Sequence, residues 1–301
     1  MRAPLTTSLR GLVASAWLAG WSLTAALRRP PRGAFRVLLL HDVPFSERPM
    51  LDRLLARLAD DDRLISPEQA EAYLEGREIG TGAKLPVLVT FDDGFASNLE
   101  VAETILPAHG VQALFFVCPG LMAAHGDDQR RQIASQIFAG RRRPEELSGH
   151  IRLMGWPELQ RLQQLGHTIG SHTLHHCQLS ALDTATVRIE IEGAANAFRE
   201  HLGVVPKWFA YPFGNIESIN AEALMIASRH HAYCRSGVRG VNDVATHRLG
   251  LLAEHIDLSA PESFQHAAVE GALDFRYRAA RTRLAQFGMQ ATQGSSPLQV
   301  A

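Results

Sequence analysis

Short hydrophobic runs alternate with helix-like patterns along most of the chain. The runs are rich in branched apolar residues, which is typical of strands buried on both faces. They fall at residues 37–41, 87–91, 113–117, 167–171, 208–211, 232–234 and 249–252. Helical spacing of apolar residues falls between them, at 96–109, 157–165, 182–202, 217–228 and 261–287. This alternation predicts an α/β fold with a parallel sheet, either closed as a barrel or open.

Two further segments differ from this pattern. Residues 126–150, called the insertion below, are polar, carry three consecutive arginines at 141–143, and are expected at the surface. The last residues, from about 289 to 301, show no periodicity and are expected to be disordered. We therefore expect one domain over residues 33–288.

The N-terminal segment is treated as separate from that domain. Residues 11–27 carry no charge, and arginines flank them on both sides. This length is at the short end for a membrane span and slightly long for a signal-peptide core. We expect residues 1–32 to be an export signal or membrane anchor with a linker, which would place the protein in the cell envelope. The alternative is a helix that packs on the domain or lies on a membrane surface, which leaves a cytoplasmic location open.

Composition narrows the classes of function. The chain has 301 residues, is 46% hydrophobic, and has a formal net charge of -1. This balance suits a folded globular protein and gives no indication of a nucleic-acid partner. The three cysteines are widely spaced and form no pattern typical of a disulfide framework.

Polar residues gather where the predicted strands end. Asp92 and Asp93 directly follow the strand at 87–91, and Gly94 then permits a turn. His41, His172 and the segment Pro212-Phe213-Gly214 follow three other strands. Because parallel strands bring their carboxyl ends to one edge, these residues should meet where α/β folds bind ligands.

Three of these residues have the character of metal ligands. His172 and His176 are four residues apart, so their rings would face the same way on a helical turn. With Asp93 they would supply three ligands and leave a position for water. Asp92 would then be free to take a proton from that water as general base. Zinc is favoured, and cobalt, nickel and iron also suit two imidazoles and a carboxylate.

Three motifs together resemble a known family. They are TFDDGF (residues 90–95), SHTLHHCQL (171–179) and FAYPFG (209–214). In this order and spacing, the chain resembles the polysaccharide deacetylases with a NodB homology domain, carbohydrate esterase family 4. The resemblance covers about residues 35–252. It implies a distorted (β/α)7 barrel and a divalent-metal hydrolase that removes acetyl groups from N-acetylglucosamine-type polymers, or sometimes from O-acetylated xylan.

The resemblance also implies roles for individual residues. Asp92 matches the catalytic base, and Asp93, His172 and His176 match the metal ligands. The residues matching the loop that shapes the acetyl pocket are Tyr211, Pro212, Phe213 and Gly214, with the Phe213 amide as the oxyanion donor. His41 is a further candidate for the pocket.

Two positions depart from the family pattern. The arginine that usually tunes the base in the third motif falls at Ala210. Its absence is also a feature of the branch that acts on poly-N-acetylglucosamine. The general acid has two candidates, His247 and His255, and neither flanking sequence matches well, so water is the third.

Two other functions stay open from the sequence. The same pocket could serve an O-acetyl esterase or a hydrolase of a small amide. The missing arginine and the unassigned acid also suit a non-catalytic carbohydrate-binding protein with a residual metal site. In each case the expected ligand is a carbohydrate or a small acetylated molecule.

Overall fold

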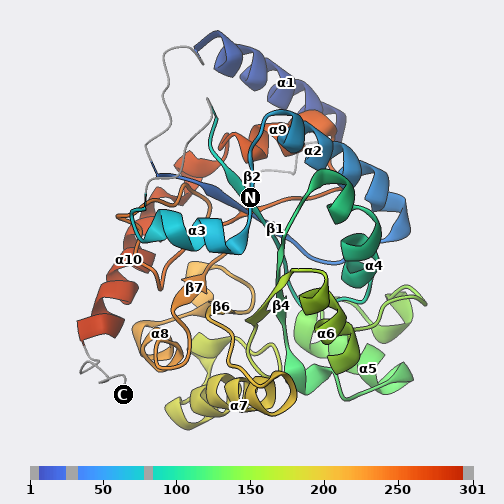
Figure 1. Cartoon of the computed structure of the whole chain (residues 1–301), viewed down its shortest axis with the longest axis vertical. Helices are drawn as coiled ribbons and strands as arrows, with labels where there is room; N and C mark the ends of the chain where they lie inside the picture. The colour runs from blue at the N-terminus through green and yellow to red at the C-terminus, as the bar shows by residue number, and fades with distance from the viewer. Residues whose placement is uncertain (1–6, 25–32, 78–83, 294–301) are drawn as a thin grey trace.

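The fold is a curled, parallel β-sheet surrounded by helices (Figure 1). The computed structural model describes residues 7–24, 33–77 and 84–293. Within them, strands β7, β6, β5, β4, β3, β1 and β8 lie side by side in that order, and β2 pairs with the start of β3. The strands are β1 (Arg36–Leu40), β2 (Leu64–Ile65), β3 (Val87–Phe91), β4 (Leu114–Val117), β5 (Thr168–Ser171), β6 (Trp208–Ala210), β7 (Tyr233–Arg235) and β8 (Glu254–His255).

One extended segment joins the two ends of this sheet. Leu251 forms a parallel bridge with Arg235 of β7, and the residues of β8 pair with β1. The expected strand at 249–252 is therefore wrong in its bounds, because only a bridge and a two-residue strand form there. The expected distorted barrel is confirmed, with its seam at residues 251–255.

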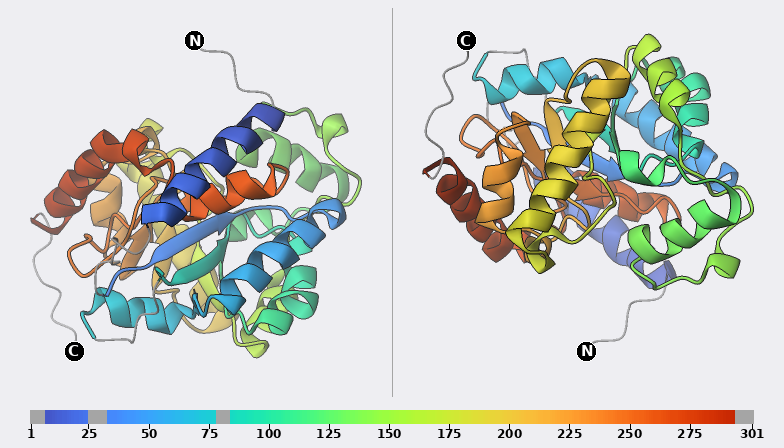
Figure 2. Two further views of the ribbon diagram at one scale, coloured as in Figure 1. Left: turned by 90° about the horizontal axis from the view of Figure 1, so that it is seen from above. Right: turned by 90° about the horizontal axis from the view of Figure 1, so that it is seen from below.

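Helices cover the outside of the sheet, as the end-on views show (Figure 2). They are α2 (Arg48–Asp60), α3 (Pro67–Leu74), α4 (Ser97–Thr104), α5 (Gly126–Gln132), α6 (Trp156–Gln164), α7 (Thr184–Leu202), α8 (Ala221–Ala227), α9 (Glu262–Val269) and α10 (Arg278–Gln293). The helix expected from residue 217 begins only at Ala221, because the Asn220 side chain caps it by accepting a hydrogen bond from the Ala223 amide at 2.9 Å.

The C-terminal helix differs from expectation in two ways. The predicted helix over 261–287 is divided into α9 and α10 by a 3₁₀ turn at Asp274–Tyr277. The tail prediction is wrong for residues 289–293, since α10 continues to Gln293 and buries Leu284, Gly288 and Ala291. Residues 294–301 lie outside the described residues.

The N-terminal segment contains helix α1 (Thr7–Thr24), which packs along α9 (Figure 2). The Ser263 hydroxyl donates a hydrogen bond to the Gly11 carbonyl at 3.1 Å. Within the described residues, no helix has the length and apolar character to cross a membrane. The expected linker, residues 25–32, lies outside the described residues, and the domain boundary at residue 33 stays a prediction.

Candidate metal centre and active site

The two adjacent aspartates sit at the point where β3 emerges from the sheet. Asp93 has a left-handed backbone with φ of 72°, and Gly94 follows with φ of 77°. A Cβ atom on Gly94 would lie only 2.9 Å from Val117, so the glycine permits a close turn against β4. This turn sends both carboxylates into the same buried space, with Asp92 and Asp93 each 3% exposed.

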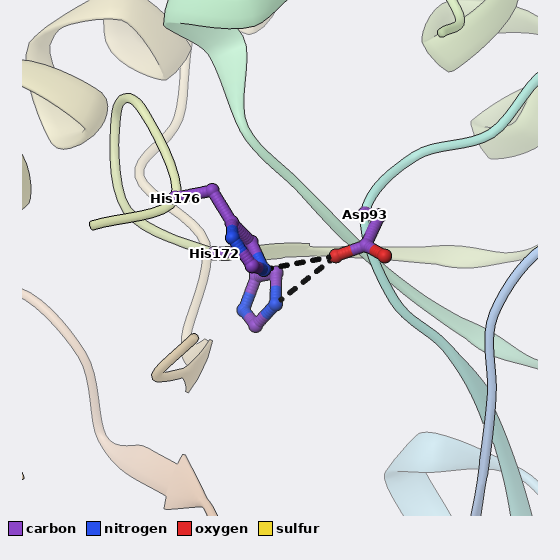
Figure 3. Close-up of side chains that lie close together, drawn as sticks. All are labelled: Asp93, His172 and His176. Carbon is purple, nitrogen blue, oxygen red and sulfur yellow. Dashed lines mark ion pairs between the residues drawn. The ribbon is translucent and has the colours of Figure 1, made fainter. Parts of the chain in front are cut away.

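Two histidines face Asp93 from the loop after β5 (Figure 3). The Nε2 atoms of His172 and His176 lie 3.5 and 3.2 Å from the Oδ1 atom of Asp93. The Nδ1 atom of His172 lies 2.7 Å from the Ala210 carbonyl, and that of His176 lies 3.1 Å from the Gln136 carbonyl. Because carbonyls only accept, each Nδ1 carries a proton, and in the neutral ring each Nε2 has a lone pair to offer to a cation.

This arrangement fits a divalent cation. The ligand atoms of Asp93, His172 and His176 all lie within 4.8 Å of one another, and all three residues are buried. With both Nε2 atoms unprotonated, no hydrogen-bond donor among the described residues satisfies the buried Oδ1 atom of Asp93. A cation bound by these three atoms would satisfy that oxygen and leave a position for a ligand.

Charge at the cluster agrees with this assignment. Burial by itself would raise the pKa of Asp93, but the imidazoles of His172 and His176 outweigh it and hold the pKa well below its usual range. Burial would lower the pKa of His176, but Asp93 outweighs it and raises that pKa. A divalent cation would displace any proton that this pair shares.

The two histidines converge for a different reason from the one expected. Residues 172–178 form an irregular loop, so the predicted helical turn is wrong. Left-handed residues at Thr173 and His176, with φ of 67° and 61°, bring the second ring back toward the first. The i,i+4 spacing therefore predicted the correct pair of ligands, although the helical backbone that it implied does not form at residues 172–178.

A buried carboxylate of helix α7 supports this loop. Glu190, 3% exposed, accepts hydrogen bonds from the His175 amide and the His175 ring, both at 2.8 Å. Its own carbonyl accepts from the Leu174 amide at 2.9 Å. His175 thus points away from the cluster and anchors the strained backbone on either side of it. No local pattern pointed to Glu190, because it lies on a separate helix, outside the motif at residues 171–179.

Asp92 has a partner that sequence reasoning missed. Arg235 at the end of β7 donates to both carboxylate oxygens of Asp92, at 2.5 and 2.6 Å, and is 1% exposed. Ala210 of β6 is the register partner of Arg235 on β7. The family usually carries an arginine at the position of Ala210. In this chain Arg235, at the paired position on the next strand, supplies the guanidinium group instead. Only the strand register could have revealed this.

A cavity of about 830 Å³ opens above these groups. Asp92, Asp93, His172 and His176 form part of its lining, with the expected pocket residues His41, Phe213 and Gly214. Tyr211 and Pro212 are buried behind this lining, and their role in shaping the acetyl pocket stays a prediction. Tyr211 donates a hydrogen bond to the Gly214 carbonyl at 3.0 Å and so braces the loop.

Phe213 presents a backbone donor at this cavity. Its φ of 64° is left-handed, and its ring stands edge-on to His176 with 4.9 Å between ring centroids. No described residue accepts a hydrogen bond from its amide. An N–H group of this kind can stabilise negative charge on a substrate oxygen.

The structure separates the two candidates for the general acid. His255 of β8 lines the cavity, and its ring centroid lies 5.3 Å from that of His41. His247 lies elsewhere: its ring packs against Gly288 of α10, and its Nδ1 atom accepts from the Leu249 amide at 3.2 Å. Burial, followed by the effects of His41 and Arg239, lowers the pKa of His255 to about 4.

A family model described as polysaccharide deacetylase matches residues 80–233, which is half of the chain. The chain belongs to the polysaccharide deacetylase family. This match confirms the expected family and the enzyme class of a hydrolytic deacetylase.

Curated relatives align only over short segments. Chitin deacetylase 2 of Saccharomyces cerevisiae is 33% identical over 69 residues, which is 23% of this chain and 22% of that protein. The uncharacterized protein YlxY of Bacillus subtilis is 36% identical over 50 residues, 17% of this chain and 16% of that protein. The chain thus matches about a fifth of the length of these relatives.

Solved deacetylase structures share the fold over most of the chain. The deacetylase PplD of Streptococcus pyogenes, in complex with acetate, has a TM-score of 0.60 at 20% identity, covering 79% of this chain and 99% of that chain. The BpsB deacetylase domain of Bordetella bronchiseptica gives 0.59 at 21%, covering 76% and 98%. IcaB of Ammonifex degensii gives 0.56 at 22%, covering 80% and 97%.

Proposed function

We propose that this polysaccharide deacetylase removes N-acetyl groups from an N-acetylglucosamine-type polysaccharide. The observation that carries the proposal is the pair formed by Asp92 and Arg235 directly beside the ligand cluster. A protein that only binds sugar has no need of a second carboxylate held rigidly at a metal site. This pairing therefore favours catalysis over the non-catalytic alternative, although the usual arginine is absent.

Each residue of the site has its own role in the proposed reaction. A divalent cation held by Asp93, His172 and His176, with zinc favoured, would polarise the acetamide carbonyl. Asp92 takes the proton from the attacking water, and Arg235 keeps both of its carboxylate oxygens in place. The Phe213 amide donates to the oxygen that becomes negative as the carbonyl is attacked.

The leaving amine also needs a proton. The pair His41 and His255 lines the cavity, whereas His247 does not. Since His255 is neutral at neutral pH, it can accept a hydrogen bond and orient the His41 ring. We assign to this pair the relay of a proton to the leaving amine, so that the proton that Asp92 takes from the water ends on that amine.

The proposal also covers the polymer and the location of the protein. The absent arginine at Ala210 and the fold shared with IcaB and BpsB favour the branch related to poly-N-acetylglucosamine deacetylases. A cell-envelope location, with membrane association through residues 11–27, would suit that substrate. It rests on the composition of the N-terminal segment.

An acetate-release assay tests the proposal. The metal-loaded chain is given N-acetylglucosamine oligomers and an O-acetylated sugar ester in parallel reactions. We expect acetate from the oligomers, dependent on added metal and abolished by a chelator. Cleavage of the ester alone would replace the proposal with an O-acetyl esterase. Bound metal without acetate from either compound would favour a binding protein.

A further inference from the structure

The insertion forms one wall of the cavity, and its arginines are not equivalent. It contains five arginines, of which three have partners outside the cavity. Arg130 donates to the Leu147 carbonyl at 2.9 Å, Arg131 pairs with Asp128, and Arg143 pairs with Glu146 at 2.8 Å. Arg141 and Arg142 line the cavity. Neither forms an ion pair with a carboxylate in the described part of the chain.

The backbone that carries these two arginines is well fixed. The insertion contains a π-helical turn at Ile133–Ile137, and a tight reversal follows it. Ala139 and Gly140 are left-handed there, with φ of 49° and 70°, and the Arg141 amide donates to the Phe138 carbonyl at 2.9 Å. The Arg142 guanidinium lies 4.9 Å from the centroid of the Phe138 ring. The backbone beneath both guanidinium groups is thus fixed, and no described carboxylate forms an ion pair with either group.

The cavity lining contains four carboxylates besides the two arginines. They are Asp92 and Asp93 at the base, together with Asp42 and Glu47. Arg235 matches the charge of Asp92, a bound cation would match Asp93, and the Asp42 carboxylate accepts from the Ser97 hydroxyl at 2.6 Å. The two arginines of the insertion remain as the cationic groups offered to a ligand.

We propose that Arg141 and Arg142 bind an anionic substituent, a carboxylate or a phosphate ester, on the sugar next to the acetylated one. Guanidinium groups bind such planar or tetrahedral anions by paired, charge-assisted hydrogen bonds. A neutral sugar offers only hydroxyl groups and gains little from two unpaired cations. The volume of about 830 Å³ leaves room beyond a single acetamido group. The inference rests on the proposed function, because it names the substrate class of the same cavity.

Binding measurements separate this inference from catalysis. Calorimetry with the zinc-loaded full chain compares two matched pairs of probes. A hyaluronan tetrasaccharide, which carries carboxylates, is compared with chitotetraose, which is neutral. Chitobiose 6-phosphate, which carries the phosphate on one of its two sugars, is compared with chitobiose. We expect the charged member of at least one pair to bind about tenfold more tightly, and the pair that discriminates identifies the anion.

Variants assign that preference to the two arginines. The double variant Arg141→Gln, Arg142→Gln should lose the tenfold preference, and rising salt should weaken it in the native chain. Arg143→Gln is the matched control, since Arg143 is adjacent and exposed but pairs with Glu146, and it should keep the preference. Equal binding of charged and neutral probes, or a preference that survives the double variant, overturns the inference. A preference without acetate release would overturn the proposed function alone.

Discussion

The base of the cavity and the wall formed by the insertion are built in opposite ways. At the base, Asp92, Asp93, His172, His176 and Arg235 are each no more than 4% exposed, and strand ends or hydrogen bonds fix every one. On the wall, Arg141 and Arg142 are exposed, and only the backbone beneath them is fixed. The difference agrees with the two proposals, in which the base carries the chemistry and the wall carries selectivity for the substrate.

The largest effect is expected from breaking the base at its metal ligand. Asp93→Asn replaces a charged ligand by a neutral amide and leaves two imidazoles. Metal content, measured by mass spectrometry after dialysis, should fall to background, and acetate release should fall at least about 100-fold. A variant that kept both metal and activity would exclude the proposed ligand set.

Removing Arg235, which supplies the guanidinium group in place of the usual arginine at position 210, should have the next largest effect. Arg235→Ala leaves the Asp92 charge buried and unpaired, so the free energy of unfolding should fall by about 3–5 kcal/mol, measured by urea denaturation. Activity should fall by about 100-fold, because Asp92 loses the group that orients it.

A second substitution sharpens this test. In the double variant Arg235→Ala, Ala210→Arg, the guanidinium returns to the register partner on β6, where the family usually carries it. Activity should recover in large part relative to Arg235→Ala. Lack of recovery in a folded double variant would contradict the equivalence of positions 210 and 235.

A smaller effect is expected from changing Glu190, which supports the loop that carries the two histidine ligands. Glu190→Gln keeps the shape of the side chain but weakens its hydrogen bonds to His175. The affinity for zinc, measured by competition with a chromogenic chelator, should fall about tenfold, as for other groups that orient ligands. Glu192→Gln, a neighbouring substitution on the outer side of α7, should leave the affinity unchanged.

The smallest effect concerns the two histidines that sequence analysis left open. His255→Ala should slow release from an N-acetyl substrate about tenfold, while activated esters, whose leaving groups need no proton, should be affected less. His247→Ala should leave both rates unchanged, because its ring packs against α10. Equal effects on amide and ester would argue against a role in proton delivery.

Much of the base could be predicted from the sequence, because each ligand lies within a few residues of the end of a predicted strand. Each of these groups stands within a few residues of a strand, and the direction of that strand determines the edge of the sheet at which the group lies. The groups are the DDG turn, His172, His176 and the Phe213 loop. The residues that were missed, Arg235 and Glu190, act across strands and helices. Their roles depend on register and helix rotation, which a local pattern does not encode.

The differences in the fold have similar physical causes. The strand expected at 249–252 is reduced to a bridge because the chain there passes from the β7 end of the sheet to β1. Helix α10 extends beyond its predicted end because Gly288 and Ala291 pack against the domain, and small residues give a weak periodic signal. The insertion has short helical turns that its polar sequence did not predict.

The most direct test of the central claim separates binding of metal from activation of water. Asp92→Asn is compared with the native chain by zinc calorimetry and by acetate release from N-acetylglucosamine oligomers. The account predicts an unchanged stoichiometry of one zinc ion and a loss of activity of about 100- to 10,000-fold. Full activity in this variant, or loss of zinc together with activity, would contradict the assignment of Asp92 as the base beside a three-residue metal site.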